Sequence, residues 1–356
     1  MTITAEERRA RILEVVHELG TVRVMDLAAR IGTASVTVRR DVAALAESGL
    51  LRRSHGAVSL PEDTPSSGQA GRDRVIGMLV PTVGSYFDEV IDGARAASAA
   101  AGARPVLGIT SYESADDRAQ VDQLLDDGID GLLLTPNWSP GSGPGETDWV
   151  RGLRVPAVLV ERLAPPDSGA AELDAVGSDH QHGVLLALRH LLRLGHDSVL
   201  LAAREDTWTA HQVRAGYDEA VALLGLKPQP VIDIRRPGLD TESVAAQIAE
   251  AVARGVRAVL VHNDQEAIQL APLLRSRGLR APDDLALISY DDVFAALAAP
   301  PLTAVAPPKR AVGAAAVELM LRRINNASEL PVHHVRLLPE LKVRTSCGGE
   351  LDEQAR

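Results

Sequence analysis

Residues 74–346 repeat one pattern, in which short apolar runs alternate with segments of helical periodicity. The apolar runs are continuous rather than alternating, so both faces of each strand should be buried. A helix after each strand favours parallel sheets that are covered by helices on both faces. We therefore predict an α/β domain of two doubly wound parallel sheets. Its strands should lie at 75–80, 105–109, 131–135, 157–160, 198–202, 231–234, 258–261 and 285–289, and its helices at 86–101, 114–127, 183–194, 213–224, 241–254, 264–277 and 309–325.

Residues 1–60 follow a different pattern. Helical spacing predicts helices at 5–19, 25–31 and 35–48, and two short strands at 50–53 and 57–60 flank His55 and Gly56. In the third helix Val38, Val42 and Leu45 recur at i, i+4 and i+7 and mark the buried stripe. Arg39 and Arg40 then lie on the opposite face. Three short helices followed by a small β-hairpin predict a helix-turn-helix with a wing.

The charge of this segment differs from that of the rest of the chain. The whole chain has a formal net charge of -11, but residues 1–60 carry nine Arg and no Lys against seven Asp and Glu. A basic segment on an acidic chain suggests an anionic partner. A helix fits the major groove of double-stranded DNA, and arginine pairs bidentately with guanine, while wing residues can reach phosphates. We expect DNA contacts from Ser35, Val36, Thr37, Arg39, Arg40, Arg52, Arg53 and His55.

Paired arginines by themselves are more often a solvated helix face, but here three helices, a glycine-bounded turn and a basic wing occur together. The motifs R-R-A-R-I-L at 8–13, T-V-R-R-D-V at 37–42 and L-L-R-R-S-H-G-A at 50–57 resemble the DeoR-type winged helix-turn-helix over about residues 6–60. In that family the recognition helix usually begins with a Ser N-cap, where this chain has Ala34. Thr33 or Ser35 is the alternative cap, which would shift the helix start by one residue.

Polar side chains gather where the predicted strands of the larger domain end. Ligands of open α/β sheets bind outside the carboxyl ends of the strands. Carboxylates, an amide and arginines at several such ends suit a polyhydroxylated ligand, and an aromatic ring can stack on its apolar face. A single residue of this kind is more often a helix cap, so the prediction depends on the recurrence. The candidates are Tyr86, Phe87, Glu161, Trp208, Arg214, Asn263 and Asp291.

The same domain resembles the sensor of the LacI/GalR family, which is periplasmic-binding-protein-like. Matching segments include V-I-G-M-L-V-P at 75–81, G-I-D-G-L-L-L at 128–134, R-A-G-Y at 214–217 and I-S-Y-D-D at 288–292, and the resemblance covers about residues 73–347. It implies two Rossmann-like lobes with the effector in the cleft between them, contacted by Glu161, Arg214, Asn263 and Asp291. LacI regulators carry a hinge helix that binds the minor groove, but residues 61–73 show no sequence pattern of such a helix. The usual sensor of DeoR regulators, in turn, resembles a sugar-phosphate isomerase. The chain therefore resembles a chimera of one family's reader and another family's sensor.

These patterns together predict the domain organisation. We expect a winged helix-turn-helix at 1–60, a flexible Pro/Gly/Ser-rich linker at 61–73, a two-lobed sensor at 74–347 and a tail at 348–356. Lobe 1 should comprise about 74–177 and 306–327, and lobe 2 about 178–303 and 328–347.

The expected function is that of a ligand-responsive, homodimeric transcriptional regulator in the cytoplasm. We expect it to repress carbohydrate-utilisation genes, to bind an operator, and to respond to a sugar or a related small molecule. The N-terminus lacks the pattern of a signal peptide, no apolar run is long enough for a membrane span, and the one cysteine, Cys347, excludes an intrachain disulfide. No metal, cofactor or enzymatic motif is evident, and we interpret D-H-Q-H at 179–182 as a helix cap and surface turn. The alternatives are a solute-binding protein and a sugar-processing protein.

Overall fold

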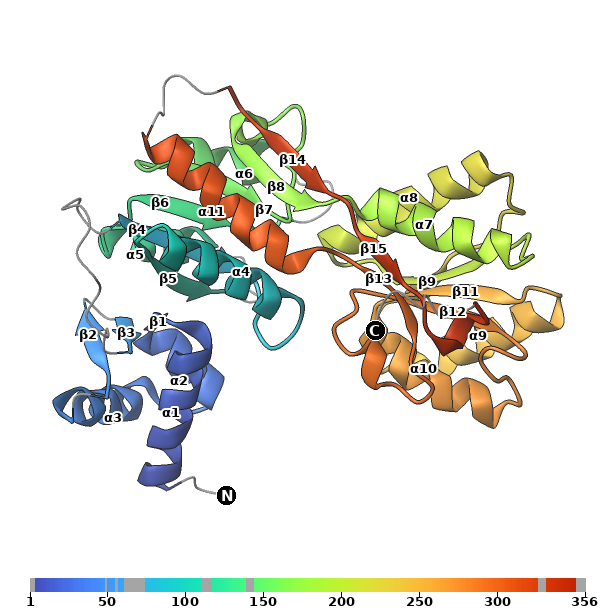
Figure 1. Ribbon diagram of the computed structural model, residues 1–356, viewed down its shortest axis with the longest axis horizontal. Helices are drawn as coiled ribbons and strands as arrows, with labels where there is room; N and C mark the ends of the chain where they lie inside the picture. Colours follow the sequence, from blue (N-terminus) through green and yellow to red (C-terminus); the bar gives the residue numbers. More distant parts are fainter. Residues whose placement is uncertain are drawn as a thin grey trace. The chain divides into compact units, whose positions relative to one another are not determined.

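The computed structural model describes residues 4–48, 50–54, 57–60, 74–110, 117–138, 144–325 and 331–349. The chain forms two compact units (Figure 1). The N-terminal unit contains the residues up to 138, 142–177 and 309–335, and the C-terminal unit contains 178–308 and the residues from 336 onward. The expected linker at 61–73, the wing residue His55 and the tail from 350 onward lie outside the described residues, as does the side chain of Arg53.

The three helices and the two wing strands predicted in the first sixty residues are present, together with one strand that was not predicted, and we call the described residues between 4 and 60 the reader domain. The helices are α1 (Ala5–Leu19), α2 (Val24–Ile31) and α3 (Ser35–Glu47), and the short strands are β1 (Val22–Arg23), β2 (Arg52–Ser54) and β3 (Ala57–Ser59). A capping box formed by Thr4 and Glu7 begins α1. Val38, Val42 and Leu45 are buried, which confirms the predicted stripe of α3.

The sheet of the N-terminal unit runs in the order β14-β8-β7-β6-β4-β5 and continues into β1, β3 and β2 of the reader domain. Its strands from β4 to β8 are parallel, with Met78 of β4 opposite Leu107 of β5 and Leu133 of β6. Met78, Leu107 and Leu133 line a cavity on the α4 side, while the neighbouring residues Leu79 and Leu132 pack with Leu124 of α5. Both faces of the sheet are therefore covered. The elements are β4 (Arg74–Val80), α4 (Tyr86–Ala100), β5 (Ala103–Ile109), α5 (Asp117–Asp126), β6 (Gly131–Leu134), α6 (Pro144–Thr147), η1 (Asp148–Gly152), β7 (Ala157–Val160), η2 (Gly169–Glu172), β8 (Asp174–Ser178), α11 (Lys309–Asn325) and β14 (His334–Leu337).

Helices α4 and α11 lie side by side (Figure 1) and approach each other at two glycines. A Cβ atom on Gly93 would lie 2.0 Å from the carbonyl oxygen of Arg310, and one on Gly313 would lie 2.0 Å from that of Val90. Only glycine allows this approach of the two backbones. The contact brings the N-terminal end of α11, which carries Lys309, next to the N-terminal part of α4, where Tyr86 and Glu89 lie.

The C-terminal unit has a second sheet, in the order β10-β9-β11-β12-β13-β15, in which only β15 is antiparallel to its neighbour. One buried cluster contains Leu200, Val259 and Leu287, and the other contains Leu201, Leu260 and Ile288, so successive residues of each strand face opposite layers. The elements are α7 (His180–Arg193), β9 (Leu200–Arg204), α8 (Trp208–Leu224), β10 (Ile232–Ile234), α9 (Thr241–Ala253), β11 (Ala258–His262), α10 (Asp264–Ser276), β12 (Ala286–Tyr290), η3 (Ala295–Leu297), β13 (Thr303–Ala306), β15 (Glu340–Lys342) and η4 (Thr345–Cys347).

The predicted fold class is confirmed, and most elements differ from their predicted bounds by a few residues. The larger differences are at helix starts, where capping decides. Asp179 accepts a hydrogen bond from the amide of His182, and Thr207 accepts one from the amide of Ala210, so α7 and α8 begin before their apolar periodicity does. This confirms the cap predicted at 179, but the surface turn predicted for 180–182 is wrong, because these residues form the first turn of α7 and His180 is buried. The sequence prediction missed β1, β8, β13, β14 and β15. Within the described residues, no helix combines the length and apolarity that a membrane span needs.

Candidate functional site

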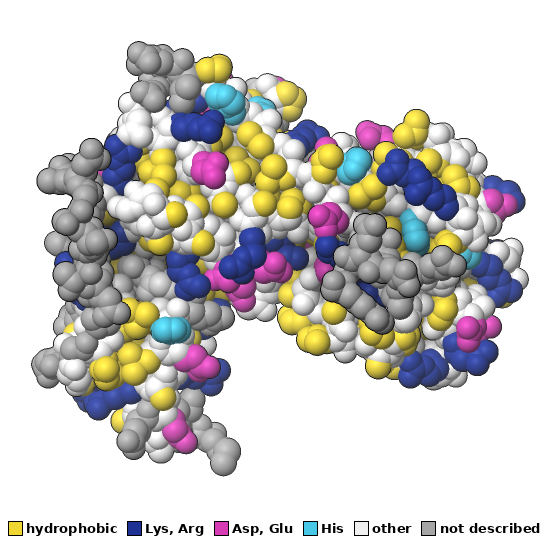
Figure 2. Space-filling model, viewed as in Figure 1, with side chains coloured by type: hydrophobic (Ala, Val, Ile, Leu, Met, Phe, Trp, Pro, Cys, Tyr) yellow, Lys and Arg dark blue, Asp and Glu magenta, His cyan; other side chains and the backbone are white. Residues whose placement is uncertain are grey.

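The outer face of α3 carries the residues predicted to read DNA. Val36 is 66% exposed although it is apolar, and Arg39 and Arg40 are also exposed, while Ser35 and Thr37 are half-buried. Figure 2 shows basic side chains at the surface over α3. An exposed valine beside two arginines gives this face both an apolar group for a thymine methyl and donors for guanine.

The start of α3 settles the question of its cap. The helix begins at Ser35 with Ala34 at the N-cap position, and no side-chain cap hydrogen bond is made there within the described residues. The expectation that Thr33 or Ser35 would act as the cap and shift the start is wrong. Ser35 is the first helical residue, so its side chain lies at the amino end of the reading face.

A buried ion-pair cluster orients α3 against α1. Asp41 is only 2% exposed, and its two carboxylate oxygens accept from Nε of Arg8 at 2.5 Å and Nε of Arg9 at 3.2 Å. Burial would raise the pKa of Asp41, but the hydrogen bonds and charges of the two arginines outweigh burial and lower it. The aspartate of the T-V-R-R-D motif therefore braces the reading helix. The sequence prediction did not assign this role, although a charged residue next to the stripe of Val38 and Val42 was a visible signal.

The wing is described only in part. Arg52, at the start of β2, is exposed, as a contact with a phosphate requires. The side chain of Arg53 and the whole of His55 lie outside the described residues. Their assignment to DNA contacts stays a prediction.

In the N-terminal unit, the predicted effector residues Tyr86 and Glu161 meet. The hydroxyl of Tyr86 donates to Oε1 of Glu161 at 2.7 Å, and Glu161 has a positive φ of 53° directly after β7. Nζ of Lys309 lies 5.7 Å from the centre of the Tyr86 ring and 3.1 Å from a carboxylate oxygen of Glu89. Strained non-glycine backbone of this kind is typical of functional sites. Ring, carboxylate and ammonium together can recognise a hydroxyl-rich ligand.

The neighbouring Phe87 has a different role. Its side chain is buried at 3% exposure and packs edge-on against Tyr86, with ring centroids 5.4 Å apart. A buried ring that contacts the tyrosine supports its position. We therefore assign Phe87 to the packing behind the candidate site instead of to stacking on a ligand.

A polar cluster beyond β6 was missed by the sequence prediction. The backbone amide of Asn137 donates to Asp117 at 2.6 Å, and its side-chain amide donates to the hydroxyl of Thr110 at 3.3 Å. Thr135 and Trp138 are buried, and within the described residues their polar side-chain atoms have no hydrogen-bond partner. Buried polar atoms without partners are costly unless a ligand or water satisfies them. The signal was present, because these residues follow directly after the apolar run at 131–134.

In the C-terminal unit, Arg214 is held firmly at the carboxyl end of β9. Its Nε donates to the carbonyl of Arg204 at 2.8 Å, and its Nη2 donates to the carbonyl of Ala203 at 2.6 Å and to Asp233 at 2.9 Å. Trp208 is the half-buried first residue of α8, just beyond this strand. The backbone carbonyls fix the direction of the guanidinium, which leaves the two N–H groups of Nη1 for a ligand.

The other two predicted residues of this unit also lie at strand ends. Asn263 is the half-buried N-cap residue of α10, and Asp291 follows β12 with a positive φ of 89°. The loop after Asp291 is held by Asp264, which accepts from the amides of Val293 and Phe294, both at 2.7 Å, and from a third backbone amide at 3.1 Å. Burial raises the pKa of Asp264 in spite of these hydrogen bonds. Asp264 is therefore a positioning residue for this loop.

A neutral histidine lies behind these strand ends. His262 is the last residue of β11, and burial, followed by the nearby His180, lowers its pKa to about 3. Its ring packs against Tyr290, with centroids 5.6 Å apart. Because it stays neutral at physiological pH, it adds no charge to the carboxylate and guanidinium groups nearby. Among the described residues, no three His, Cys, Asp or Glu side chains gather as a metal site would require.

Comparisons with known proteins agree with both parts of the chain. Residues 8–64 match the family of DeoR-like helix-turn-helix domains, and residues 188–347 match the periplasmic binding protein-like domain. The HTH-type transcriptional repressor PurR of Vibrio atlanticus is 30% identical over 75% of this chain and 79% of its own length. The arabinose metabolism transcriptional repressor of Geobacillus stearothermophilus is 24% identical over 87% of this chain and 86% of its own length.

The fold is similar to that of a solved regulatory protein of the LacI family from Chloroflexus aggregans. The TM-score is 0.66 at 22% identity, with 77% of this chain and 98% of that one covered. Two independent patterns, a DeoR-like reader and a two-lobed sensor, thus match known regulators in the order in which the sequence predicts them. The chain belongs to the LacI family of transcriptional repressors, with a DNA-reading domain of the DeoR-like helix-turn-helix type.

Proposed function

We propose that this protein represses carbohydrate-utilisation genes as a cytoplasmic homodimer whose operator affinity depends on a sugar or a related small molecule. The observation that carries the proposal is the exposed Arg39–Arg40 face of α3, braced by buried Asp41, on a chain that also has a two-lobed sensor. A dimer places two such helices on the half-sites of a near-palindromic operator. Expression of target genes then follows the occupancy of the sensor.

The residues divide by role. Ser35, Val36, Thr37, Arg39 and Arg40 are assigned to base edges in the major groove, and Arg52, Arg53 and His55 to phosphates. The assignment of α3 rests on the exposure of Val36 and the two arginines. That of the wing rests on its basic sequence, L-L-R-R-S-H-G.

The effector is assigned to the strand-end residues of the sensor. In the N-terminal unit Tyr86 and Glu161 offer a phenol and a carboxylate. In the C-terminal unit Arg214, Asn263 and Asp291 offer a guanidinium, an amide and a carboxylate, and groups of these kinds pair with hydroxyl groups. Trp208 is the candidate stacking ring. The name of the Geobacillus relative, a repressor of arabinose metabolism, supports a sugar as the class of ligand. Effector binding is coupled to operator binding if the effector binds one arrangement of the sensor more tightly than the other. A difference of about 1–3 kcal/mol is the typical strength of such coupling.

The decisive experiment measures DNA binding and its response to ligands in the purified full-length protein. Promoter fragments from the gene's own neighbourhood are titrated at a fixed salt concentration, with a coding-region fragment of equal length as the control. A thermal-shift screen of sugars and nucleosides then selects compounds whose effect on promoter affinity is tested. We expect specific binding that at least one stabilising compound changes. Failure to distinguish any promoter fragment from the control would contradict the regulator, and turnover of a sugar would favour an enzyme.

A further inference from the structure

The reader domain is docked on the sensor as an extension of its sheet. Strand β1 pairs in parallel with β5, with Val22 opposite Leu107, and it pairs antiparallel with β3. The backbone amide of Leu107 also donates to the carbonyl of Thr21 at 3.3 Å. A free edge strand attracts another strand because its backbone groups are unpaired. The short β1 therefore covers part of the β5 edge.

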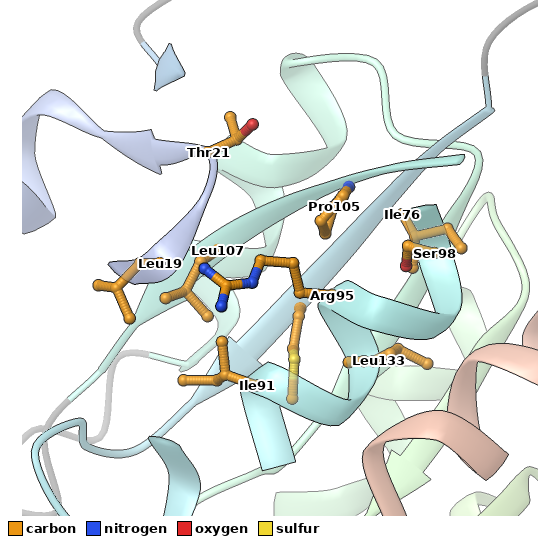
Figure 3. Close-up of a pocket in the computed structure, with 11 residues that line it drawn as sticks. Leu19, Thr21, Ile76, Ile91, Arg95, Ser98, Pro105, Leu107 and Leu133 are labelled. Atoms are coloured by element: carbon orange, nitrogen blue, oxygen red, sulfur yellow. The ribbon is translucent and has the colours of Figure 1, made fainter. Parts of the chain in front are cut away.

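Side chains complete the contact around a small cavity (Figure 3). Leu19 and Thr21 of the reader domain and Ile91, Arg95 and Leu107 of the sensor are among the residues that line it. Nη1 of Arg95 donates to the carbonyl of His17, in the last turn of α1, at 3.1 Å. Burial of these apolar groups favours docking.

Two buried ionisable groups of the reader domain oppose docking. Arg23 is 2% exposed, and its Nη2 contacts Asp127 of the sensor at 2.7 Å, while within the described residues its Nε and Nη1 have no hydrogen-bond partner. Asp26 of α2 is also buried, and the backbone amide of Ile109 only partly opposes the increase in its pKa that burial causes. Incompletely paired buried charges are costly, so they offset much of the apolar gain. The reader domain is therefore suited to reversible docking on the sensor and release from it.

The contact reaches the candidate effector residues through the end of β5. Ile109, whose backbone amide acts on the pKa of Asp26, is the last residue of that strand, and the next residue, Thr110, accepts from the side chain of Asn137 in the polar cluster beyond β6. The amide of Thr110 also donates to the carbonyl of Val80 at 2.9 Å. One peptide bond thus separates Ile109, which is next to the reader domain, from Thr110, which belongs to the polar cluster beyond β6.

Docking leaves the reading face of α3 accessible within the N-terminal unit, because Val36, Arg39 and Arg40 stay exposed. The sequence between the two parts, residues 61–73, is thirteen residues long and spans at most roughly 45 Å when fully extended. A docked reader has a fixed direction relative to the sensor sheet, whereas an undocked reader does not. Two docked readers therefore present a higher effective concentration to a two-half-site operator.

We propose that docking of the reader domain on β5 couples the sensor to DNA: the docked arrangement binds the operator tightly, and the strand-end cluster at Thr110 and Asn137 controls docking through Ile109. This inference rests on the proposed function, since it concerns operator binding. It replaces the hinge helix, of which the sequence at 61–73 shows no pattern, with a direct contact between reader and sensor.

The first test compares Asp127→Asn with Asp126→Asn in the full-length protein. Asp126 is the matched control, because its pair with Arg154 is exposed at the surface. Hydrogen exchange reports docking at the amides of Leu107 and Ile109, and titration of the promoter fragment reports DNA binding. We expect Asp127→Asn to speed exchange at both amides and to weaken promoter binding, each about tenfold, while Asp126→Asn leaves both unchanged. Equal exchange in the two variants overturns docking, and faster exchange with unchanged DNA affinity overturns the coupling.

A second pair of variants protects the test against simple misfolding. Arg23→Met removes the buried charge and keeps the length of the side chain, so it should dock at least as well as the unsubstituted protein and bind the promoter with equal or higher affinity. Asn137→Ala should speed exchange at Ile109 and change promoter affinity; no effect on either overturns the path through β5. If the unsubstituted protein binds no promoter fragment, the proposed function fails. Hydrogen exchange still reports docking in that case, so failure of the proposed function and failure of docking are distinguished.

Discussion

At the scale of single residues, buried charges organise the reader domain. Asp41 is enclosed by Arg8 and Arg9, and its pKa lies below the usual range, whereas Asp26 has fewer partners and its pKa is raised. The same residue type thus has opposite roles in one small domain. Asp41 fixes α3 to α1. Asp26 makes the contact with the sensor depend on whether its carboxyl group is protonated.

Replacement of Asp41 by Ala should destabilise the reader domain by about 3 kcal/mol, because the largely buried Arg8 would lose the carboxylate that it contacts. Hydrogen exchange of the amides of α1 and α3 measures the change. Glu14→Ala, which removes an exposed carboxylate from α1, is the control and should change stability by less than about 0.5 kcal/mol. Equal protection in the two variants would show that the cluster does not brace α3.

Docking should weaken as pH rises. Burial raises the pKa of Asp26 from 3.8 to about 7, and the nearby Arg23, which is paired with Asp127, and the amide of Ile109 only partly oppose this. The docked form therefore binds the proton more tightly than the released form. Its stabilisation is complete below the ordinary pKa of 3.8 and is lost progressively as pH rises to about 7. Exchange at Leu107, corrected for its intrinsic pH dependence, should reveal this, and Asp26→Asn should abolish it. A pH-independent protection factor in the unsubstituted protein would contradict the prediction.

At the scale of elements, helix α3 carries the residues assigned to DNA, and the strand ends of the sensor carry those assigned to the effector. Helix α3 presents an exposed basic face. The carboxyl ends of β7, β11 and β12 carry Glu161, Asn263 and Asp291, and Arg214 of α8 reaches the carboxyl end of β9. Glu161 and Asp291 both adopt a positive φ, so the backbone at these two strand ends is strained. Each element therefore serves one partner, DNA or effector.

On α3, Arg39→Ala and Arg40→Ala should each cost about 1–3 kcal/mol of affinity for the specific operator and relax the preference for one base pair. Arg154→Ala, which removes an equal charge from an exposed site just before β7, controls for the change in net charge. Fluorescence anisotropy at one salt concentration measures all three. Unchanged operator affinity in both α3 variants would remove these residues from the reading face.

At the strand end of β7, Glu161→Gln keeps the shape of the side chain but weakens the acceptor that Tyr86 contacts. Affinity for the effector found by thermal shift should fall about tenfold, because a charge-assisted hydrogen bond is worth about 1.5–3 kcal/mol. Operator affinity without effector should stay the same. Glu172→Gln, at an exposed pair with Arg151, is the matched control. Equal effector affinity in the two variants would exclude Glu161 from the site.

At the scale of the whole molecule, charge is divided between the parts. Residues 1–60 have nine basic and seven acidic residues, a difference of +2, and the remaining residues have 28 and 41, a difference of -13. DNA therefore attracts the reader domain and repels the sensor. Raising salt from about 50 to about 200 mM should weaken operator binding by about 10³-fold or more if six to ten phosphates are contacted. Effector affinity, measured by calorimetry over the same range, should hardly change; equal salt dependence of both would contradict this division.

The sequence determined the class of fold and the position of most elements because their signals are local. Apolar runs of four to six residues predicted the central strands, and the stripe of Val38, Val42 and Leu45 was sufficient to orient α3. Exposed Arg39 and Arg40 followed from that stripe alone. Helix starts were less predictable, since Asp179 and Thr207 act through caps that lie outside the apolar period.

The tertiary structure decided which of the candidate residues meet and how the parts connect. The Tyr86–Glu161 hydrogen bond, the clamp of Arg8 on Asp41 and the pairing of Val22 with Leu107 join residues that are 75, 33 and 85 positions apart, the last being 107 − 22. No periodicity in the sequence encodes such distances, because they depend on how complete elements pack. For the same reason β1, two residues long, has no strand signal of its own and exists only because the edges of β3 and β5 lie on either side of it.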